Sequence, residues 1–301
     1  MKQPTIRPRD LGLVLLVILA WGVNFAVIKM GLSDVPPLLL GALRFIVAAF
    51  PAVFFFRAPK VPLRWYLAYG LAISVGQFAL LFTAIHVGMP SGLASLVLQA
   101  QSFFTLLLAA FWLKESWHAN QMAGLLLAAT GLMLIGSAHG ASMPLLGFLL
   151  TLAAALMWAC GNIVTRIIGQ FGPMNQFAFV VWASLVPPLP FLALSALIEG
   201  PTAMATALQH LQPTSMAAIV YLAWVATLMG YGVWTRLLAR YSVNRIAPFT
   251  MLVPLIGLIT GWLVFDEALH PIHFAGGALL MAGLVVNVFG ATWLARLSRK
   301  T

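Results

Sequence analysis

The sequence predicts an all-α membrane protein whose ten transmembrane helices form two inverted five-helix repeats. Ten apolar stretches fill almost all of the 301 residues, and each is close to the ~20 residues that a helix needs to cross a bilayer. The composition agrees, because 62% of the residues are hydrophobic and only 7% are charged. A soluble domain with so few polar residues could not cover its own surface.

The ten predicted spans divide equally between two halves of the chain, residues 1–140 and 141–301. The first half contains residues 11–31, 36–56, 65–85, 92–113 and 121–137. The second half contains residues 143–164, 177–198, 216–238, 246–265 and 272–294. The first span is longer than the apolar core of a signal peptide and lacks a small-x-small cleavage pattern, so we expect it to be retained.

The basic residues follow the positive-inside rule. The net charge of +10 would suit nucleic acid only if the charges were gathered on one surface. With the N-terminus assigned to the cytoplasm, every Lys and Arg except Lys29 and Arg44 falls on a cytoplasmic segment. The external loops receive acidic residues instead: Asp34, Glu199, Asp266 and Glu267. The charge therefore predicts a multi-pass bacterial inner-membrane protein with both termini in the cytoplasm, and we expect no nucleic-acid partner.

Several residues of the first half recur in the second. Four recur at one offset of 152 positions: Glu115, His118, Gly124 and Gly131 correspond to Glu267, His270, Gly276 and Gly283. Trp21 and Lys29 in the first span are eight residues apart, as are Trp158 and Arg166 in the sixth. Matches at one offset indicate a duplication. Because each half has five spans, the second half enters the membrane in the opposite orientation.

Inverted repeats have a mechanical meaning. Two copies of one fold in opposite orientations can exchange conformations, so that the protein opens alternately to the two faces around a site near the midplane. The duplication therefore predicts a carrier that works by alternating access, although some channels share this symmetry.

Several motifs carry a resemblance to a known family. They are Trp21-Gly22-x-Asn24 in the first span, Pro36-Pro37 followed by Leu43-Arg44-Phe45 in the second, Trp158-Ala159-x-x-Asn162 in the sixth, and the glutamates that close the fourth and ninth. Together they resemble the drug/metabolite transporter superfamily and, within it, the EamA family of ten-helix exporters. Segments 88–101 and 149–162 look similar to bacterial exporters of O-acetylserine and cysteine. The resemblance implies export of small amphiphilic metabolites, with cysteine-pathway amino acids as the leading substrates.

Other classes of function compete with a carrier for such metabolites. The alternatives are an exporter of other amino acids or drug-like solutes, a lipid flippase, and a membrane scaffold. An intramembrane enzyme is disfavoured because no span contains His-Glu-x-x-His. We expect no enzymatic activity, no catalytic residues, no metal and no cofactor. The expected partners are the lipid bilayer and a small amino-acid-like substrate, and the chain is expected to act as a monomer or as an oligomer of undefined size.

Arg44 is the leading candidate for substrate binding. A polar side chain within hydrocarbon is costly unless it faces a cavity or a partner. Arg44 lies eight residues beyond Pro36, ~12 Å along a helix that rises 1.5 Å per residue. Its guanidinium can bind a substrate carboxylate as a fork. The alternative is a structural arginine that bonds to carbonyls or extends to the interface.

Two further groups of polar residues lie within the spans. Trp21, Asn24, Trp158 and Asn162 occupy similar places in the two halves and could flank the pseudo-twofold axis. The alternative is interhelical hydrogen bonding for the asparagines and packing for the tryptophans. The second group contains candidates for the lining of the path: Gln77, Gln99 and Tyr231. Of these, Gln99 shares a helix face with Ser95 and Ser102, whereas Gln101 falls on another face.

The six carboxylates all lie at or outside the predicted membrane boundaries. Glu115 and Glu267 close the fourth and ninth spans, and we expect them to cap or pair at helix ends, with His118 and His270 as candidate partners. Ion-coupled carriers usually bury a carboxylate within the membrane. The sequence therefore leaves facilitated diffusion and proton antiport both open.

Overall fold

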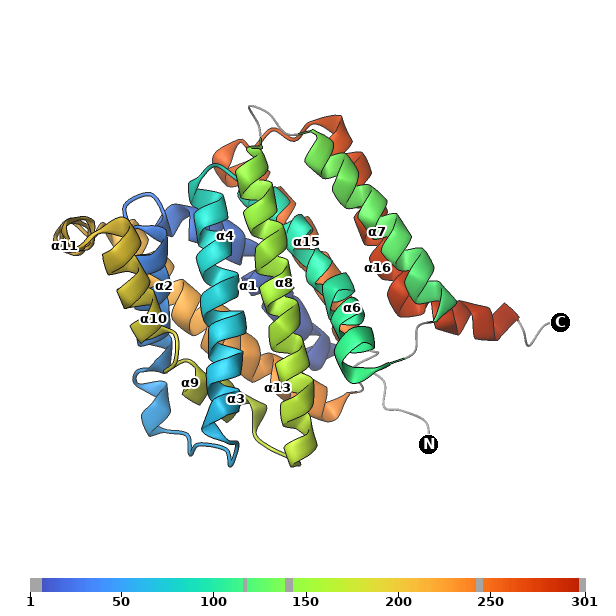
Figure 1. The fold of residues 1–301 in the computed structure, drawn as a ribbon, viewed down its shortest axis with the longest axis horizontal. Helices are drawn as coiled ribbons and strands as arrows, with labels where there is room; N and C mark the ends of the chain where they lie inside the picture. The colour runs from blue at the N-terminus through green and yellow to red at the C-terminus, as the bar shows by residue number, and fades with distance from the viewer. Residues whose placement is uncertain (1–6, 116–117, 139–142, 242–245, 298–301) are drawn as a thin grey trace.

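The computed structural model describes residues 7–115, 118–138, 143–241 and 246–297. Within these ranges, ten helical segments are long and apolar enough to cross a membrane, which confirms the predicted all-α fold with ten spans. We number the segments as spans 1–10 in chain order. Figure 1 shows them as a bundle in which elements distant in the sequence lie side by side.

The first five spans are built from seven α-helices with two short 3₁₀ turns and one π-helical segment. They are α1 (Pro8–Gly31) in span 1; α2 (Pro37–Ala49) and η1 (Ala52–Phe54) in span 2; α3 (Leu63–Tyr69), η2 (Gly70–Gly76) and α4 (Gln77–His86) in span 3; α5 (Ser91–Val97), η3 (Leu98–Ala100) and α6 (Gln101–Leu113) in span 4; and α7 (Ala119–Ser137) in span 5.

The last five spans contain two more π-helical segments. They are α8 (Leu145–Ile168) and η4 (Gly169–Phe171) in span 6; α9 (Gln176–Ala183), α10 (Pro188–Leu194) and η5 (Ser195–Glu199) in span 7; α12 (Pro213–Val220), η6 (Tyr221–Met229) and α13 (Gly230–Arg240) in span 8; η7 (Ala247–Leu252) and α15 (Val253–Phe265) in span 9; and α16 (Pro271–Leu297) in span 10. A further helix, α11 (Pro201–Gln209), connects spans 7 and 8.

The predicted boundaries agree with these helices within three residues at every start. Only one end differs by more, because span 6 continues to Phe171 instead of residue 164. The extension carries the polar residues Thr165, Arg166 and Gln170, and a hydropathy pattern stops at the last apolar residue before them. The hydrogen bonds of a helix continue until the backbone turns, which for span 6 happens at Gly172 with a φ of 103°.

The duplicated glycines form the contact between spans 5 and 10. A Cβ on Gly124 would lie 2.6 Å from the carbonyl oxygen of Gly283, and one on Gly131 would collide with that of Gly276. Figure 1 shows α7 and α16 side by side at one edge of the bundle. Only glycine lets two helix backbones approach this closely. The crossed pairing of equivalent residues is what a twofold axis between the halves produces, and it is consistent with the predicted inverted repeat.

Equivalent helices of the two halves also exchange partners in the interior of the bundle. α1 packs against α15, and its counterpart α8 packs against α6. The main hydrophobic core contains buried apolar side chains from both halves, among them residues of α1, α2, α4, α5 and α8. Large apolar side chains also cover the outside of the bundle, where lipid is their natural solvent.

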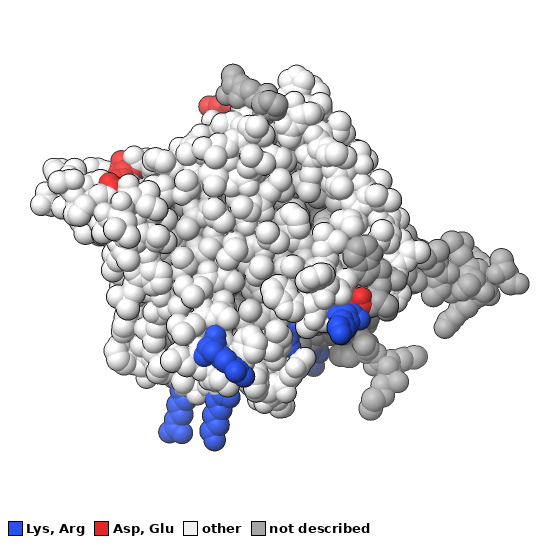
Figure 2. Space-filling view, viewed as in Figure 1, with Lys and Arg blue, Asp and Glu red and all other residues white. Residues whose placement is uncertain are grey.

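The charged residues lie mainly at the two ends of the bundle, and most of the basic ones lie at one end. Figure 2 shows Lys and Arg gathered at one end, with the middle of the molecule almost free of charge. We call this end, which bears the exposed Arg57, Lys60 and Arg166, the basic end. We call the opposite end, which bears Glu199 and Glu267, the acidic end. This separation is the one that the sequence predicts for a membrane protein.

Candidate substrate site

Arg44 is buried in the interior of the bundle. It lies on α2, is only 3% exposed, and is surrounded by aromatic rings. Its Cζ is 4.1 Å from the ring centroid of Phe78, 5.1 Å from that of Phe45 and 5.9 Å from that of Phe82. A guanidinium is weakly hydrated and stacks on aromatic faces, so this environment suits arginine better than lysine.

The guanidinium of Arg44 is only partly satisfied by the protein. Its Nη2 donates to Thr227 Oγ1 at 3.0 Å and, more weakly, to the carbonyl of Leu222 at 3.4 Å. Among the described residues, Nε and Nη1 have no hydrogen-bond partner, and no carboxylate lies within 4.0 Å of the group. A buried cation without a counter-ion is costly. Donors of Arg44 therefore remain available in the interior.

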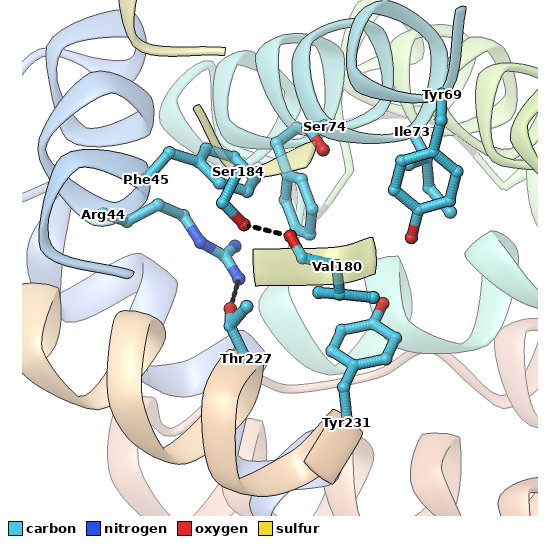
Figure 3. A pocket seen from close by; sticks show the side chains of 10 residues that line it. Arg44, Phe45, Tyr69, Ile73, Ser74, Val180, Ser184, Thr227 and Tyr231 are labelled. Carbon is cyan, nitrogen blue, oxygen red and sulfur yellow. Dashed lines mark hydrogen bonds between the residues drawn. The ribbon is translucent and has the colours of Figure 1, made fainter. Parts of the chain in front are cut away.

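A small cavity lies against this guanidinium. Figure 3 shows Arg44 pointing toward Thr227, with Ser184 and Val180 on the other side of the group. The cavity is lined by residues of spans 2, 3, 7 and 8: Arg44, Phe45, Tyr69, Ile73, Ser74, Phe78, Val180, Ser184, Thr227 and Tyr231. Its volume is about 20 Å³, which admits about one water molecule. An amino acid would need the surrounding helices to move apart.

Two π-helical segments contribute to the walls. They are η2 in span 3, which supplies Ile73 and Ser74, and η6 in span 8, which supplies Thr227. Spans 3 and 8 are counterparts in the two halves. The hydroxyl of Thr227 donates to the carbonyl of Leu222, five residues earlier, at 2.8 Å. Wide helical turns of this kind occur often at functional sites.

The polar groups of the cavity wall are one cation and several hydroxyls. The hydroxyl-bearing residues are Tyr69, Ser74, Ser184, Thr227 and Tyr231, and no Asp or Glu is among the lining residues. Ser184 donates to the carbonyl of Val180 at 2.8 Å. The site can therefore offer a positive charge to an anion and hydrogen bonds to a small polar group, against aromatic walls.

Two of the predicted site residues, Arg44 and Tyr231, line the cavity. Trp21 lies directly behind Tyr231, with 5.6 Å between the ring centroids. The indole nitrogen of Trp21 donates to the carbonyl of Ala226 at 3.0 Å. Trp21 therefore supports the wall without lining it.

Asn24 and Gln77 are buried but are not among the residues that line the cavity. Asn24 is 9% exposed and its Oδ1 has no partner among the described residues, and Gln77 is 4% exposed. Gln77 immediately precedes Phe78, which lines the cavity. Substrate contact by either residue stays a prediction.

The remaining predicted residues do not line the cavity, although Trp158 packs against the cluster that contains the lining residues Tyr69 and Ile73. Asn162 Nδ2 donates to Gln101 Oε1 at 2.8 Å and to Thr105 Oγ1 at 3.0 Å, which links α8 to α6. Neither Asn162 nor Asn24 is among the residues that line the cavity. Trp158 is half-buried against the core, and Gln99 is half-buried in η3. Roles for these residues in substrate binding stay predictions.

The sequence did not indicate four of the hydroxyl-bearing residues of the site: Tyr69, Ser74, Ser184 and Thr227. Serine and threonine are common in membrane helices, where they bond to the backbone of their own helix. One signal was available, because Thr227 lies four residues before the predicted Tyr231 and therefore on the same helix face. Figure 3 shows both side chains on the same wall.

The fold and site define a class: a polytopic helical membrane protein in which two five-span halves enclose a buried cation beside a cavity. A sequence profile of the EamA-like transporter family matches residues 10–137 and 145–289. The chain belongs to the EamA-like transporter family, and the predicted resemblance is confirmed.

Two curated relatives resemble the chain over nearly its whole length. A "Probable amino-acid metabolite efflux pump" of Escherichia coli strain K12 is 48% identical over 288 residues, covering 95% of this chain and 96% of the relative. A protein of the same name from Salmonella typhimurium strain LT2 is 50% identical over 285 residues, covering 94% and 95%. A "Probable terminal-alkyne amino-acid exporter" of Streptantibioticus cattleyicolor is 27% identical and covers 91% of each chain.

A solved structure, named only "Crystal structure of protein", has the same fold. It superposes with a TM-score of 0.61 at 20% sequence identity and covers 96% of this chain and 98% of the other. This similarity supports the arrangement of the ten spans.

Proposed function

We propose that this protein exports small amino-acid metabolites across the bacterial inner membrane by alternating access, with O-acetylserine and cysteine as leading substrates. Membership of a transporter family supports a carrier. The names of the relatives at 48% and 50% identity support amino-acid metabolites as the class of substrate. O-acetylserine and cysteine come from the sequence resemblance alone.

The buried guanidinium of Arg44 is the observation that carries this proposal. Every amino acid has a carboxylate, and a carboxylate would satisfy the Nε and Nη1 donors that lack a partner. The charge of the bound substrate would replace the counter-ion that the described residues do not supply. Hydrogen bonds to charged groups contribute more than neutral ones, so Arg44 would provide much of the binding free energy.

The cavity is located where an alternating-access site is expected. Spans 2 and 3 of the first half and spans 7 and 8 of the second half supply its walls, so movement between the halves changes its size and access. A volume of about 20 Å³ corresponds to a contracted site. Substrate entry would separate Arg44 and Phe45 from the residues of span 7.

We assign the basic end to the cytoplasm on the positive-inside rule. Substrate would then enter at the basic end, and leave at the acidic end. Because no Asp or Glu lines the cavity, we propose that the outward gradient of the metabolite drives export. Asp10 and the Glu267 side chain are buried, but both lie at helix ends and are bonded to other residues.

The test is competition for uptake of labelled O-acetylserine into proteoliposomes, with the set of amino acids as competitors. Cysteine and close relatives should compete best, and uptake should saturate. Competition only by drug-like cations would move the assignment to another solute class of the superfamily. Movement of labelled lipid without amino-acid flux would indicate a flippase, and no flux of any probe would leave a scaffold as the alternative.

A further inference from the structure

Three ion pairs among the described residues join the two halves of the chain. The longest is Arg240 Nη1 to Asp10 Oδ1 at 3.4 Å, and the other two lie at opposite ends of the bundle. At the acidic end, Lys29 Nζ lies 2.7 Å from Glu267 Oε1. At the basic end, Arg166 Nη1 lies 2.8 Å from Glu115 Oε1. The two bases hold the same position after the tryptophans of spans 1 and 6, and the two glutamates recur at the offset of 152. The duplication therefore relates one pair to the other, with base and acid exchanged between halves.

One kind of backbone turn presents both glutamates. Directly after α6 and α15, Lys114 and Asp266 adopt left-handed conformations with φ of 55° and 50°. They are the non-glycine residues of positive φ in the described ranges, and such residues are uncommon. In each turn the N–H of the next residue, Glu115 or Glu267, donates at 3.4 Å to the carbonyl six positions earlier. The left-handed turn that places a glutamate at each end of the bundle is therefore present in both halves.

The two ion pairs differ in burial. The side chain of Glu267 is 7% exposed and that of Lys29 is 33% exposed, whereas those of Arg166 and Glu115 are 50% and 49% exposed. Glu267 also accepts hydrogen bonds from the first residues of α5: from Ser91 N at 2.8 Å, Ser91 Oγ at 3.0 Å and Gly92 N at 3.0 Å. Glu267 thus pairs with span 1 and caps the amino end of span 4.

Small residues make room for the Glu267 carboxylate. A Cβ on Gly261 would collide with Glu267 Oε2, and a Cβ on Gly92 would lie 3.4 Å from the same oxygen. Gly261 therefore leaves space for the Glu267 carboxylate at the acidic end. The first half has Ala109 at the equivalent position, so this space is not repeated at the basic end.

We propose that these ion pairs are the two latches of the transport cycle, one for each face. The acidic-end latch is Lys29–Glu267, and the basic-end latch is Arg166–Glu115. The basic end also has the Arg240–Asp10 pair, but that pair is longer, at 3.4 Å, and its arginine is 56% exposed. Because the acidic-end latch is shorter, buried and has additional hydrogen bonds, it opens less readily, and the unloaded protein opens mainly at the basic end. This proposal rests on the carrier function and orientation given above, in which an exporter takes up its substrate at that end.

Each latch joins residues of different halves, so the two latches would break and form in turn as the protein opens at one end and closes at the other. Opening either end separates the halves there. Neither Lys29 nor Arg166 is among the residues that line the cavity. The latches would therefore change which end opens without changing the groups that bind substrate.

The test measures access to the cavity from each side. Ser184→Cys provides a thiol in the wall, and Cys160→Ser removes the native cysteine. A membrane-impermeant thiol reagent is applied to inside-out and to right-side-out vesicles. Lys29→Met should raise the labelling rate from the acidic end by ~10-fold or more, as expected for a broken buried pair. Arg166→Met should raise labelling from the basic end by no more than ~5-fold, as for an exposed pair.

Charge exchange at the exposed latch provides a matched control. Arg166→Glu opposes two carboxylates and should raise labelling from the basic end, and adding Glu115→Arg should restore the wild-type rate. If Lys29→Met folds and labelling from the acidic end does not change, the latch assignment is wrong. If Lys29→Met does not fold, the charge exchange between Arg166 and Glu115 tests the proposal instead. The proposal is then overturned if Arg166→Glu combined with Glu115→Arg does not restore the wild-type labelling rate.

Labelling and transport test the latches and the function separately. The thiol assay needs no substrate, so a shift in labelling without amino-acid flux would support the latches and contradict the proposed function. Saturable amino-acid flux with labelling unaffected by all four substitutions would support the function and remove the latches.

Discussion

Arg44 Nη2 donates to Thr227 Oγ1 across 3.0 Å, and this bond connects span 2 of the first half to the π-helical segment of span 8 in the second. The same threonine donates to the carbonyl of Leu222 at 2.8 Å. Thr227 is thus fixed by its own helix and holds one end of the guanidinium. The bond crosses the interface that must move if the two halves alternate.

Thr227→Val should weaken substrate binding by releasing Arg44. Valine has nearly the same shape but cannot accept the hydrogen bond, so the guanidinium loses its fixed orientation. Loss of a charged hydrogen bond predicts a rise of ~10-fold in the half-saturation concentration, measured in proteoliposomes. Thr227→Ser, which keeps the hydroxyl, should stay close to wild type. An equal change for serine and valine would show that the hydroxyl does not position Arg44.

Gly131→Ala should destabilise the contact between spans 5 and 10. The new Cβ would collide with the carbonyl oxygen of Gly276 and lie 2.7 Å from the backbone nitrogen of Leu280. Overpacking of this kind costs ~1–3 kcal/mol, and a fall in Tm of the purified protein in detergent measures it. Gly12→Ala is the control, because nothing lies within 4 Å of its Cβ. Equal Tm values for the two variants would contradict the close approach of these two helices.

The acidic-end latch should give the protein a measurable acid sensitivity. Burial by itself would raise the pKa of Glu267, but hydrogen bonds from Lys29, Gly92 and Ser91 outweigh it and lower the pKa below the ordinary value of 4.5. Since the folded protein favours the ionised form, this contribution to stability is complete above 4.5 and is lost as the pH falls through the lower folded value.

Glu267→Gln tests that contribution. The amide cannot titrate, so the Tm of the variant should lie below that of wild type near neutral pH. The difference should shrink as the pH is lowered from about 6 to about 3. A Tm difference that is constant over this range would mean that the ionised carboxylate does not stabilise the fold.

Collapsing a pH gradient should barely change the initial flux of substrate. The motivation is the lining of the cavity, which contains a cation and hydroxyls but no carboxylate that would carry a proton. Flux is compared in proteoliposomes with and without an imposed gradient at equal substrate concentration. Flux that follows the proton gradient in size and sign would require coupling through another group.

The ten spans could be predicted because their apolar length is a property of each segment alone. The duplicated Glu115 and Glu267 could also be predicted to cap or pair at helix ends, and the structure confirms this. The prediction of His118 and His270 as their partners was wrong, because the bases that reach them come from spans 1 and 6. Such contacts depend on how helices cross, which hydropathy does not contain.

The site could be predicted only in part for a similar reason. Arg44 is conspicuous in any apolar span, and its burial beside the cavity agrees with the prediction. Asn162 looked equivalent to Asn24, but its partner is Gln101 on α6, a residue that the helical-face argument separated from the polar stripe. That argument assumes a regular helix, whereas η3 interrupts span 4 at Leu98–Ala100. The π-helical segments likewise have no signature in hydropathy.

The most direct test of the central claim compares an amino acid with its carboxamide as competitors for uptake of labelled O-acetylserine, in the wild type and in Arg44→Lys. If Arg44 binds the substrate carboxylate, the free acid competes with the wild type and the carboxamide does not. Lysine keeps the charge but loses the planar fork, so Arg44→Lys should raise the half-saturation concentration strongly. Arg236→Lys, at an exposed position on α13, serves as the matched control and should leave it unchanged. Equal competition by acid and amide, together with wild-type uptake by a folded Arg44→Lys protein, would contradict carboxylate binding by Arg44.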